Sequence, residues 1–185
     1  MSMLIILALI AAVAGYVIYV YNRLVANRQM SEEAWSGIDV QLKRRSDLIP
    51  NLVETVKGYA SHERETLTRV TELRNEAAAV PSGDVEGRAR VEGALSLALG
   101  RLLAVAEAYP DLKASANFLE LQRDLSSVED EIQMSRRYYN GAVRNLNTLI
   151  ESFPSNLVAS QFGFAKRVYF EIEDPGDRAL PKVAF

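Results

Sequence analysis

The sequence contains no cysteine and a single histidine, His62. The lack of cysteine excludes disulfides, thiolate metal ligands and a cysteine nucleophile, and one histidine cannot support a mechanism that needs two imidazoles. An excess of positive charge is also missing, because 21 basic residues face 24 acidic ones and the formal net charge is −3. Without a basic surface to attract phosphate groups, nucleic-acid binding is not expected. With 49% hydrophobic and 24% charged residues, the 185-residue chain still has the composition of one globular domain.

Charge is absent from residues 3–20, an apolar run of 18 residues. As a helix this run is about 27 Å long, close to the roughly 30 Å of a bilayer's hydrocarbon core. A cleaved signal peptide is the competing interpretation, but no basic residue precedes the run and small residues are missing from its end. We therefore expect a transmembrane anchor over residues 1–21. The residues that suit the membrane interface at its end are Tyr16, Tyr19, Tyr21 and Arg23.

Positive charge follows the anchor and does not precede it. Arg23 and Arg28 come directly after the apolar run, and only Met1 and Ser2 come before it. The single apolar run predicts a single-pass membrane protein, and the positive-inside bias predicts its orientation. Its short N-terminus would lie outside, and its C-terminal domain would be cytoplasmic.

Helical periodicity dominates the rest of the chain. Steps of three and four from Trp35 fall mainly on apolar residues as far as Val80 and stay in phase across Pro50. Proline removes one helical hydrogen bond, so we expect a kink there; a complete reversal at Pro50 is the alternative. The expected fold is all-α, an anchor helix continuous with an elongated, antiparallel, coiled-coil-like bundle of three to four helices. The bundle spans residues 22–165, with helices at about 22–79, 88–108, 115–152 and a short one at 155–163, and an irregular tail follows at 166–185.

These predicted helices differ in length, which predicts an uncovered apolar seam. At 1.5 Å per residue they measure about 87, 30 and 57 Å in chain order. A connector as short as the second helix cannot cover both long seams, and exposed apolar stripes usually mark interfaces. We therefore predict a homo-oligomer. The candidate interaction residues are Trp35, Ile38, Leu42, Arg45, Ile49, Leu52, Tyr139, Leu146, Leu149 and Phe153.

The charged and titratable residues give no pattern typical of catalysis or metal binding. Arg45 falls on the apolar seam, where it either fixes register or partner or extends to the edge of the seam. His62 lacks the glutamate of a di-iron Glu-x-x-His pattern, because position 59 is Tyr59. Neighbouring carboxylates, such as Glu32 and Glu33, suit solvated helix faces. We expect no enzyme, no cofactor, no metal and no small-molecule substrate.

Two stretches carry a more specific signature. The first includes Trp-Ser-Gly-Ile-Asp-Val-Gln-Leu-Lys-Arg-Arg at 35–45 and Asp-Leu-Ile-Pro-Asn-Leu-Val at 47–53. The second is Arg-Tyr-Tyr-Asn-Gly-Ala-Val at 137–143, followed by Phe-Pro-Ser-Asn-Leu at 153–157 and Phe-Gly-Phe at 162–164. This order and spacing resembles the LemA family of bacterial membrane proteins over nearly the whole chain. The resemblance implies one transmembrane helix, a cytoplasmic helical domain and no established enzymatic activity; a relative takes part in forming magnetosome membranes.

Two classes of function follow from these patterns. The first is a non-enzymatic scaffold in the lipid bilayer that self-assembles through its heptad seams and shapes or organises the membrane. The second is an adaptor or regulator that docks one specific membrane partner, such as a protease or a signalling protein. Assembly of the purified chain alone would favour the scaffold, and a stoichiometric co-purifying protein would favour the adaptor.

Overall fold

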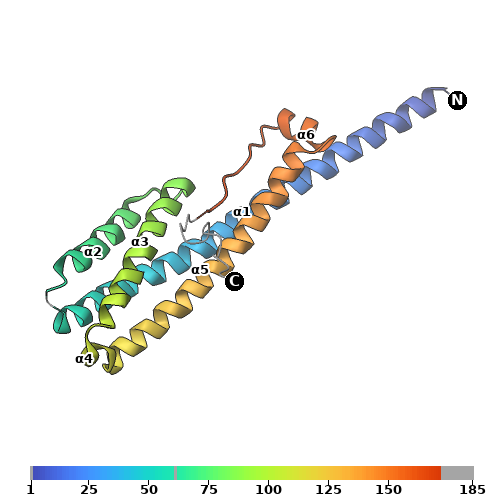
Figure 1. Cartoon of the computed structure of the whole chain (residues 1–185). Helices are drawn as coiled ribbons and strands as arrows, with labels where there is room; N and C mark the ends of the chain where they lie inside the picture. Colours follow the sequence, from blue (N-terminus) through green and yellow to red (C-terminus); the bar gives the residue numbers. More distant parts are fainter. Residues whose placement is uncertain (1, 61, 172–185) are drawn as a thin grey trace, which may run out of the picture. The chain divides into compact units, whose positions relative to one another are not determined.

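A computed structural model describes residues 2–60 and 62–171, and this part of the chain folds into helices without any strand (Figure 1). The all-α class expected from the sequence is confirmed, with one long apolar N-terminal helix followed by packed helices. Residues 166–171 are not helical, and the rest of the predicted tail, 172–185, lies outside the described residues. The helices are α1 (Ser2–Tyr59), α2 (Arg64–Ala79), α3 (Val85–Ala106), α4 (Pro110–Lys113), α5 (Ala116–Glu151) and α6 (Ser155–Gln161).

The chain divides into two compact units. Unit 1 contains the residues up to Ile38 together with Ser135–Tyr169. Unit 2 contains Asp39–Met134 and the segment that begins at Phe170. The two longest helices, α1 and α5, therefore each contribute one part to unit 1 and another part to unit 2.

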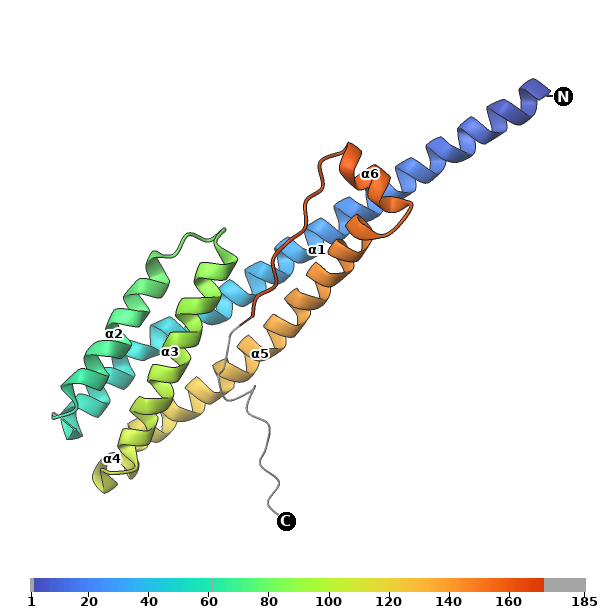
Figure 2. The same cartoon turned by 45° about the horizontal axis from the view of Figure 1, so that its top comes forward.

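Unit 2 is a helical bundle that contains the end of α1, then α2, α3, the short α4 and the start of α5 (Figure 2). Each of the longer segments supplies apolar residues three or four positions apart, and these side chains meet in a single core. Asp84 caps α3 by accepting a hydrogen bond from the Gly87 amide at 2.8 Å. The buried core residues are Ile49, Leu52, Val56, Ala60, Leu67, Val70, Leu73, Leu95, Ala98, Leu99, Leu102, Ala106, Leu112, Phe118 and Leu125.

The continuous helix expected over residues 22–79 is wrong. Helix α1 ends at Tyr59, and the chain reverses before α2 begins at Arg64. The physical reason lies in the apolar seam that starts at Trp35. Tyr59 is half-exposed, and the next two positions of this seam, Glu63 and Thr66, are polar. In α2 the seam positions Val70, Leu73 and Ala77 are buried together with Leu67. Helix α2 turns this apolar face to the same core.

Pro50 neither ends α1 nor reverses the chain. The helix continues through it for nine more residues. Because proline has no N–H, the carbonyl of Ser46 one turn earlier loses its usual helical donor. The side chain of Arg74 on α2 replaces that donor, with its Nε 2.9 Å from the Ser46 oxygen. A helix–helix contact thus compensates for the proline.

Unit 1 consists of the first part of α1, the last part of α5, α6 and the extended segment that follows α6. Its apolar core is smaller than that of unit 2. Val20 and Leu24 of α1 pack with Leu146 of α5 and with Val158 and Ala159 of α6. This core explains why α6 stays folded although it has only seven residues.

A glycine in the left-handed region ends α6. Gly163 has φ 70°, a conformation that costs little only for glycine. The amide of Phe164 donates to the Ala159 carbonyl at 2.9 Å, and the Gly163 amide donates to that of Ser160 at 3.3 Å. This pair of bonds is a Schellman motif, which satisfies the last carbonyls of the helix and turns the chain back along α5.

Candidate functional site

The start of α1 is the most unusual surface of the chain. In the described part, α1 is the one helix long and apolar enough to cross a membrane. Its large apolar side chains are uncovered over the first turns; Leu4, for example, exposes 71% of its surface and Ile10 exposes 59%. In water, burying each such side chain would stabilise the protein by roughly 1.5–3 kcal/mol. This surface therefore fits a hydrocarbon environment.

The predicted interface residues lie where this apolar surface meets the folded part of unit 1. Tyr16 and Tyr19 are exposed, as is Arg23. Tyr21 is partly covered, because its ring makes edge contacts with those of Phe162 at 4.9 Å and Phe164 at 5.8 Å. Protein packing thus begins within the last turn of the apolar run.

The uncovered heptad seam expected in the bundle is wrong. Most of its residues are buried by the chain itself. The reversal after Tyr59 lets α2 cover the end of α1, and Tyr139 and Leu146 are buried within unit 1. Trp35 and Leu149 are partly buried, and the Trp35 ring lies 5.4 Å from that of Tyr139. Of the ten candidates, Phe153 is exposed. The buried ones are Ile38, Leu42, Arg45, Ile49, Leu52, Tyr139 and Leu146.

Arg45 is the centre of a buried ionic network in unit 2. Its side chain is fully covered, so the interpretation that it extends to the edge of the seam is wrong. One guanidinium nitrogen lies 2.5 Å from a Glu92 carboxylate oxygen, and the other contacts Glu129 at 2.6 Å and Ser96 at 2.7 Å. A buried cation needs such partners, because desolvation otherwise costs several kcal/mol. The network joins α1, α3 and α5.

Arg88 extends this network on α3. Its Nε lies 2.9 Å from the second Glu92 oxygen, and its other nitrogens reach the Ala77 carbonyl at 3.2 Å and Asp39 at 3.3 Å. Both Glu92 oxygens are thereby occupied by arginines. A carboxylate held in this way neutralises positive charge within the core.

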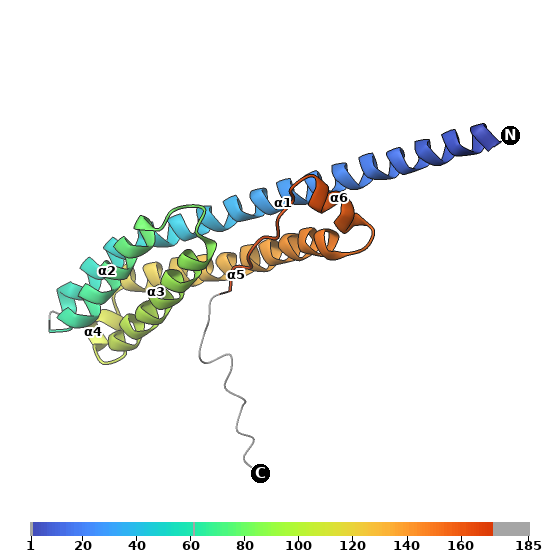
Figure 3. The same cartoon turned by 90° about the horizontal axis from the view of Figure 1, so that it is seen from above.

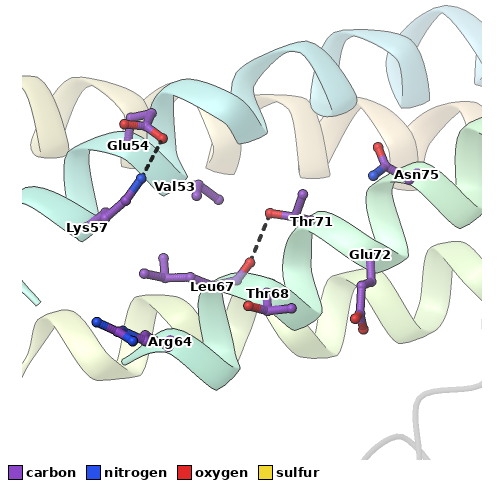
Figure 4. Close-up of a pocket in the computed structure, with 9 residues that line it drawn as sticks. All are labelled: Val53, Glu54, Lys57, Arg64, Leu67, Thr68, Thr71, Glu72 and Asn75. Carbon is purple, nitrogen blue, oxygen red and sulfur yellow. Dashed lines mark hydrogen bonds and ion pairs between the residues drawn. The ribbon is translucent and has the colours of Figure 1, made fainter. Parts of the chain in front are cut away.

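A groove lies between the end of α1 and α2 in unit 2 (Figure 4). Its volume is about 600 Å³. Val53 and Leu67 give it apolar walls, while Glu54 and Lys57 form an exposed ion pair at 3.5 Å. The other lining residues are Arg64, Thr68, Thr71, Glu72 and Asn75.

Polar contacts fix the extended segment after α6 within unit 1. The buried side chain of Asn147 donates to the Arg167 carbonyl and accepts from its amide, both at 2.9 Å. The Tyr139 hydroxyl donates to the Val168 carbonyl at 2.9 Å. Burial raises the pKa of Tyr139, and the positive charge of Arg167 opposes that rise.

Two exposed ion pairs reinforce the same segment. Lys166 contacts Glu151 at 2.7 Å, and Arg167 contacts Glu32 at 2.6 Å. The hydrogen bond to Glu151 raises the pKa of Lys166. The segment is thus tied to both α1 and α5.

Metal-binding geometry is not found in residues 2–60 and 62–171, where no three His, Asp or Glu side chains converge. His62 is exposed in the turn before α2. Sequence reasoning missed Glu92, Ser96, Glu129, Arg88 and Asn147. A usable signal existed for Glu92, which precedes Leu95 by three and Leu99 by seven positions and therefore falls on the apolar face of its helix, where a carboxylate needs a basic partner.

Comparison with known proteins agrees with this architecture. A family model described as the LemA family matches residues 34–185. Protein LemA of Metamycoplasma hominis is 30% identical over 163 residues, which cover 86% of this chain and 73% of that protein. Magnetosome protein MamQ 2 of Paramagnetospirillum magneticum is 26% identical over 184 residues, which cover 86% of this chain and 68% of that protein. Magnetosome protein MamQ of Magnetospirillum gryphiswaldense is 24% identical, with the same coverage.

Proposed function

This chain belongs to the LemA family, and from that premise we propose that it is a membrane-anchored, non-enzymatic helical scaffold. The observation that carries the proposal is the exposed apolar start of α1, which continues without a break into folded helices. A rigid helical connection transmits the position of the anchor to unit 1. The chain then holds its helices at a defined place on the membrane.

The orientation that we propose places the folded helices in the cytoplasm. Arg23 and Arg28 follow the apolar run and are exposed. Basic residues next to a span are retained on the cytoplasmic side. The short N-terminus, with Ser2, would then lie outside the inner membrane.

The buried charges of unit 2 support a structural role. Arg45 and Glu92 form a buried ion pair, and Arg88 pairs with the remaining Glu92 oxygen. An enzyme would keep a polarised group available to a substrate. The relatives that are named as magnetosome proteins support membrane association.

Self-assembly, if it forms the scaffold, must use surfaces other than the heptad seam. The seam residues Ile38, Leu42 and Ile49 are buried within one chain. We propose that copies associate through the membrane-embedded part of α1 and the surfaces next to it. An alanine substitution at Ile38 is therefore a poor test, because it would create a cavity and destabilise the fold.

Step photobleaching tests the scaffold. The chain has no cysteine, so a single Asn145→Cys variant, exposed on α5, can be labelled and reconstituted into vesicles at a low protein-to-lipid ratio. We expect several bleaching steps per vesicle spot, more than random co-occupancy predicts. A distribution that matches random co-occupancy at every ratio would contradict self-assembly.

The groove of unit 2 favours a second candidate function, an adaptor for one membrane partner. A photo-crosslinker at Thr68 would lie in the groove, and one at Glu76 on the same helix would lie outside it (Figure 4). A single protein crosslinked stoichiometrically from Thr68 and absent from Glu76 would favour the adaptor. Equal crosslinking from both positions would exclude the groove as a docking site.

A further inference from the structure

The turn between α5 and α6 carries apolar side chains that the chain does not cover. Phe153 exposes 81% of its surface, Leu157 exposes 60% and Phe162 exposes 51%. The surrounding residues 152–165 contain no Asp, Glu, Lys or Arg. Exposed turns are normally polar, and a cluster of exposed apolar side chains usually marks an interaction surface. We call Phe153, Leu157 and Phe162 the α5–α6 corner.

Packing within unit 1 fixes the α5–α6 corner beside the end of the apolar run. Val158 and Ala159 of α6 belong to the same buried cluster as Val20 of α1, and Val17 packs against that cluster. The ring of Phe162 lies 4.9 Å from that of Tyr21. Helix α6 therefore lies beside the last turn of the run.

The length of the run determines the depth of α6. Eighteen residues of helix span about 27 Å, and a hydrocarbon core needs about 30 Å. Val17 and Val20 lie in the last turn of this run. Because nearly the whole run is needed to cross the core, these two residues must lie in the core or at its boundary. Because α6 packs on these residues, α6 lies at the level of the headgroups. Within unit 1, the α5–α6 turn is on the side of α6 that faces the N-terminal end of α1 (Figures 2 and 3).

Charged side chains border the corner where the apolar surface stops. Arg23 is exposed on α1, one turn beyond Tyr19. The guanidinium of Arg28 lies 5.4 Å from the ring centre of Phe164. Lys166 follows the charge-free stretch and pairs with Glu151, which precedes it. Basic residues at this level match the phosphate groups of lipids.

We propose that the α5–α6 corner inserts into the boundary between headgroups and acyl chains beside α1, so that the chain contacts lipid at two places. This inference rests on the proposed anchoring of α1. A lipid surface fits better than a second copy or another protein, because the corner continues the exposed apolar surface of α1 and carries no charge. Interfacial elements of this kind bury their apolar face about 5–10 Å deep. Two contacts fix the tilt of unit 1 on the membrane.

Fluorescence quenching by brominated lipids tests the insertion. The full chain, with single cysteines carrying the fluorophore NBD, is reconstituted into phosphatidylcholine–phosphatidylglycerol vesicles brominated at a shallow or a deep acyl position. Labels at Phe153→Cys and Leu157→Cys report on the corner, and a label at Ile10→Cys reports on the anchor. Tyr138→Cys is the matched control, because Tyr138 is an exposed aromatic residue of unit 1 next to Tyr139, which contacts Trp35. Trp35 lies fifteen residues, about 22 Å, beyond Val20.

We expect blue-shifted emission and quenching by shallow bromine at both corner positions, quenching by deep bromine at Ile10, and neither effect at Tyr138. Adding Phe153→Asp to the Leu157→Cys chain should abolish its quenching, because a carboxylate resists transfer out of water. Quenching at Ile10 with water-exposed corner labels overturns the inference and leaves the anchor intact. Blue-shifted corner labels that bromine does not quench overturn it in favour of a second copy or a protein partner. An unquenched Ile10 label overturns the anchor and the inference together.

Discussion

Unit 2 encloses charge, whereas unit 1 leaves apolar side chains uncovered. In unit 2, Arg45 and Glu92 are buried beside a core of leucine, valine and alanine. In unit 1, Ile10 and Phe153 are exposed, and the buried Asn147 side chain is hydrogen-bonded to the backbone of Arg167. Water favours burial of the apolar core of unit 2, and lipid would favour the exposed apolar side chains of unit 1. The two units therefore differ in where their apolar side chains lie, enclosed in unit 2 and partly exposed in unit 1.

The largest effect is expected when the buried charge of unit 2 is removed. Arg45→Ala leaves one oxygen of the buried Glu92 without its arginine while Arg88 still pairs with the other, and we expect the free energy of unfolding to fall by at most about 3–5 kcal/mol. Chemical denaturation of the full chain in mild detergent, followed by circular dichroism, measures the change.

The matched control is Lys43→Ala, which removes an exposed pair whose side chains are 71% and 55% accessible. Its effect should stay below about 1 kcal/mol. Arg45→Met combined with Glu92→Met removes the two most buried charges and should recover part of the loss, because Arg88 keeps Asp39 as a partner and Glu129 is partly exposed. Equal effects of Arg45→Ala and Lys43→Ala would refute a structural role for the network.

In unit 1 the corresponding polar contact is Asn147. Asn147→Ala removes two hydrogen bonds to the Arg167 backbone, which should lower stability by about 1–3 kcal/mol. Hydrogen–deuterium exchange should show faster exchange at residues 166–169 and in α6. Asn145→Ala, exposed on the same helix, is the control. Unchanged exchange at residues 166–169 would show that these bonds do not hold the segment.

The third prediction concerns the hydrogen bond from Arg74 to the Ser46 carbonyl, one turn before Pro50. Arg74→Met leaves the Ser46 carbonyl without its donor, at a cost of about 1 kcal/mol. Pro50→Ala restores the helical N–H, so the same Arg74 substitution should then cost less. A double-mutant cycle by denaturation measures this coupling, and a coupling of zero would mean that Arg74 does not compensate for the proline.

The smallest expected changes in stability are those of two glycine substitutions. Gly163→Ala forces a left-handed conformation on alanine and should cost about 1 kcal/mol. Gly141→Ala, in the interior of α5 with no atom near the added methyl group, should be stabilising by about 0.5–1 kcal/mol. Thermal unfolding of both variants compares them directly; the same sign for both would contradict the Schellman end of α6.

Periodicity in the sequence was sufficient to predict α3, α5 and α6 to within a few residues. It failed at the reversal after Tyr59, because Ala60 and Glu63 are ordinary helix formers and no proline or asparagine marks the turn. The signal was present in the polar seam positions Glu63 and Thr66. Because this reversal was not predicted, no helix was available to cover the seam of α1. The seam was therefore wrongly predicted to be exposed.

The partners of Arg45 could not be predicted in the same way. Glu92 and Glu129 lie 47 and 84 residues away in the sequence. Local spacing carries no information on such pairs, which depend on how the helices pack. The position of Arg45 on the seam did predict that it needed an unusual environment.

Accessibility of single cysteines to a membrane-impermeant maleimide tests the central claim, a cytoplasmic helical scaffold anchored by α1, most directly. The measurement compares Ser2→Cys, Ile10→Cys and Asn145→Cys in intact spheroplasts and after lysis. The account predicts labelling of Ser2→Cys from outside, labelling of Asn145→Cys only after lysis, and no labelling of Ile10→Cys in either state. Labelling of Ser2→Cys and Asn145→Cys from the same side, or free labelling of Ile10→Cys, would contradict it.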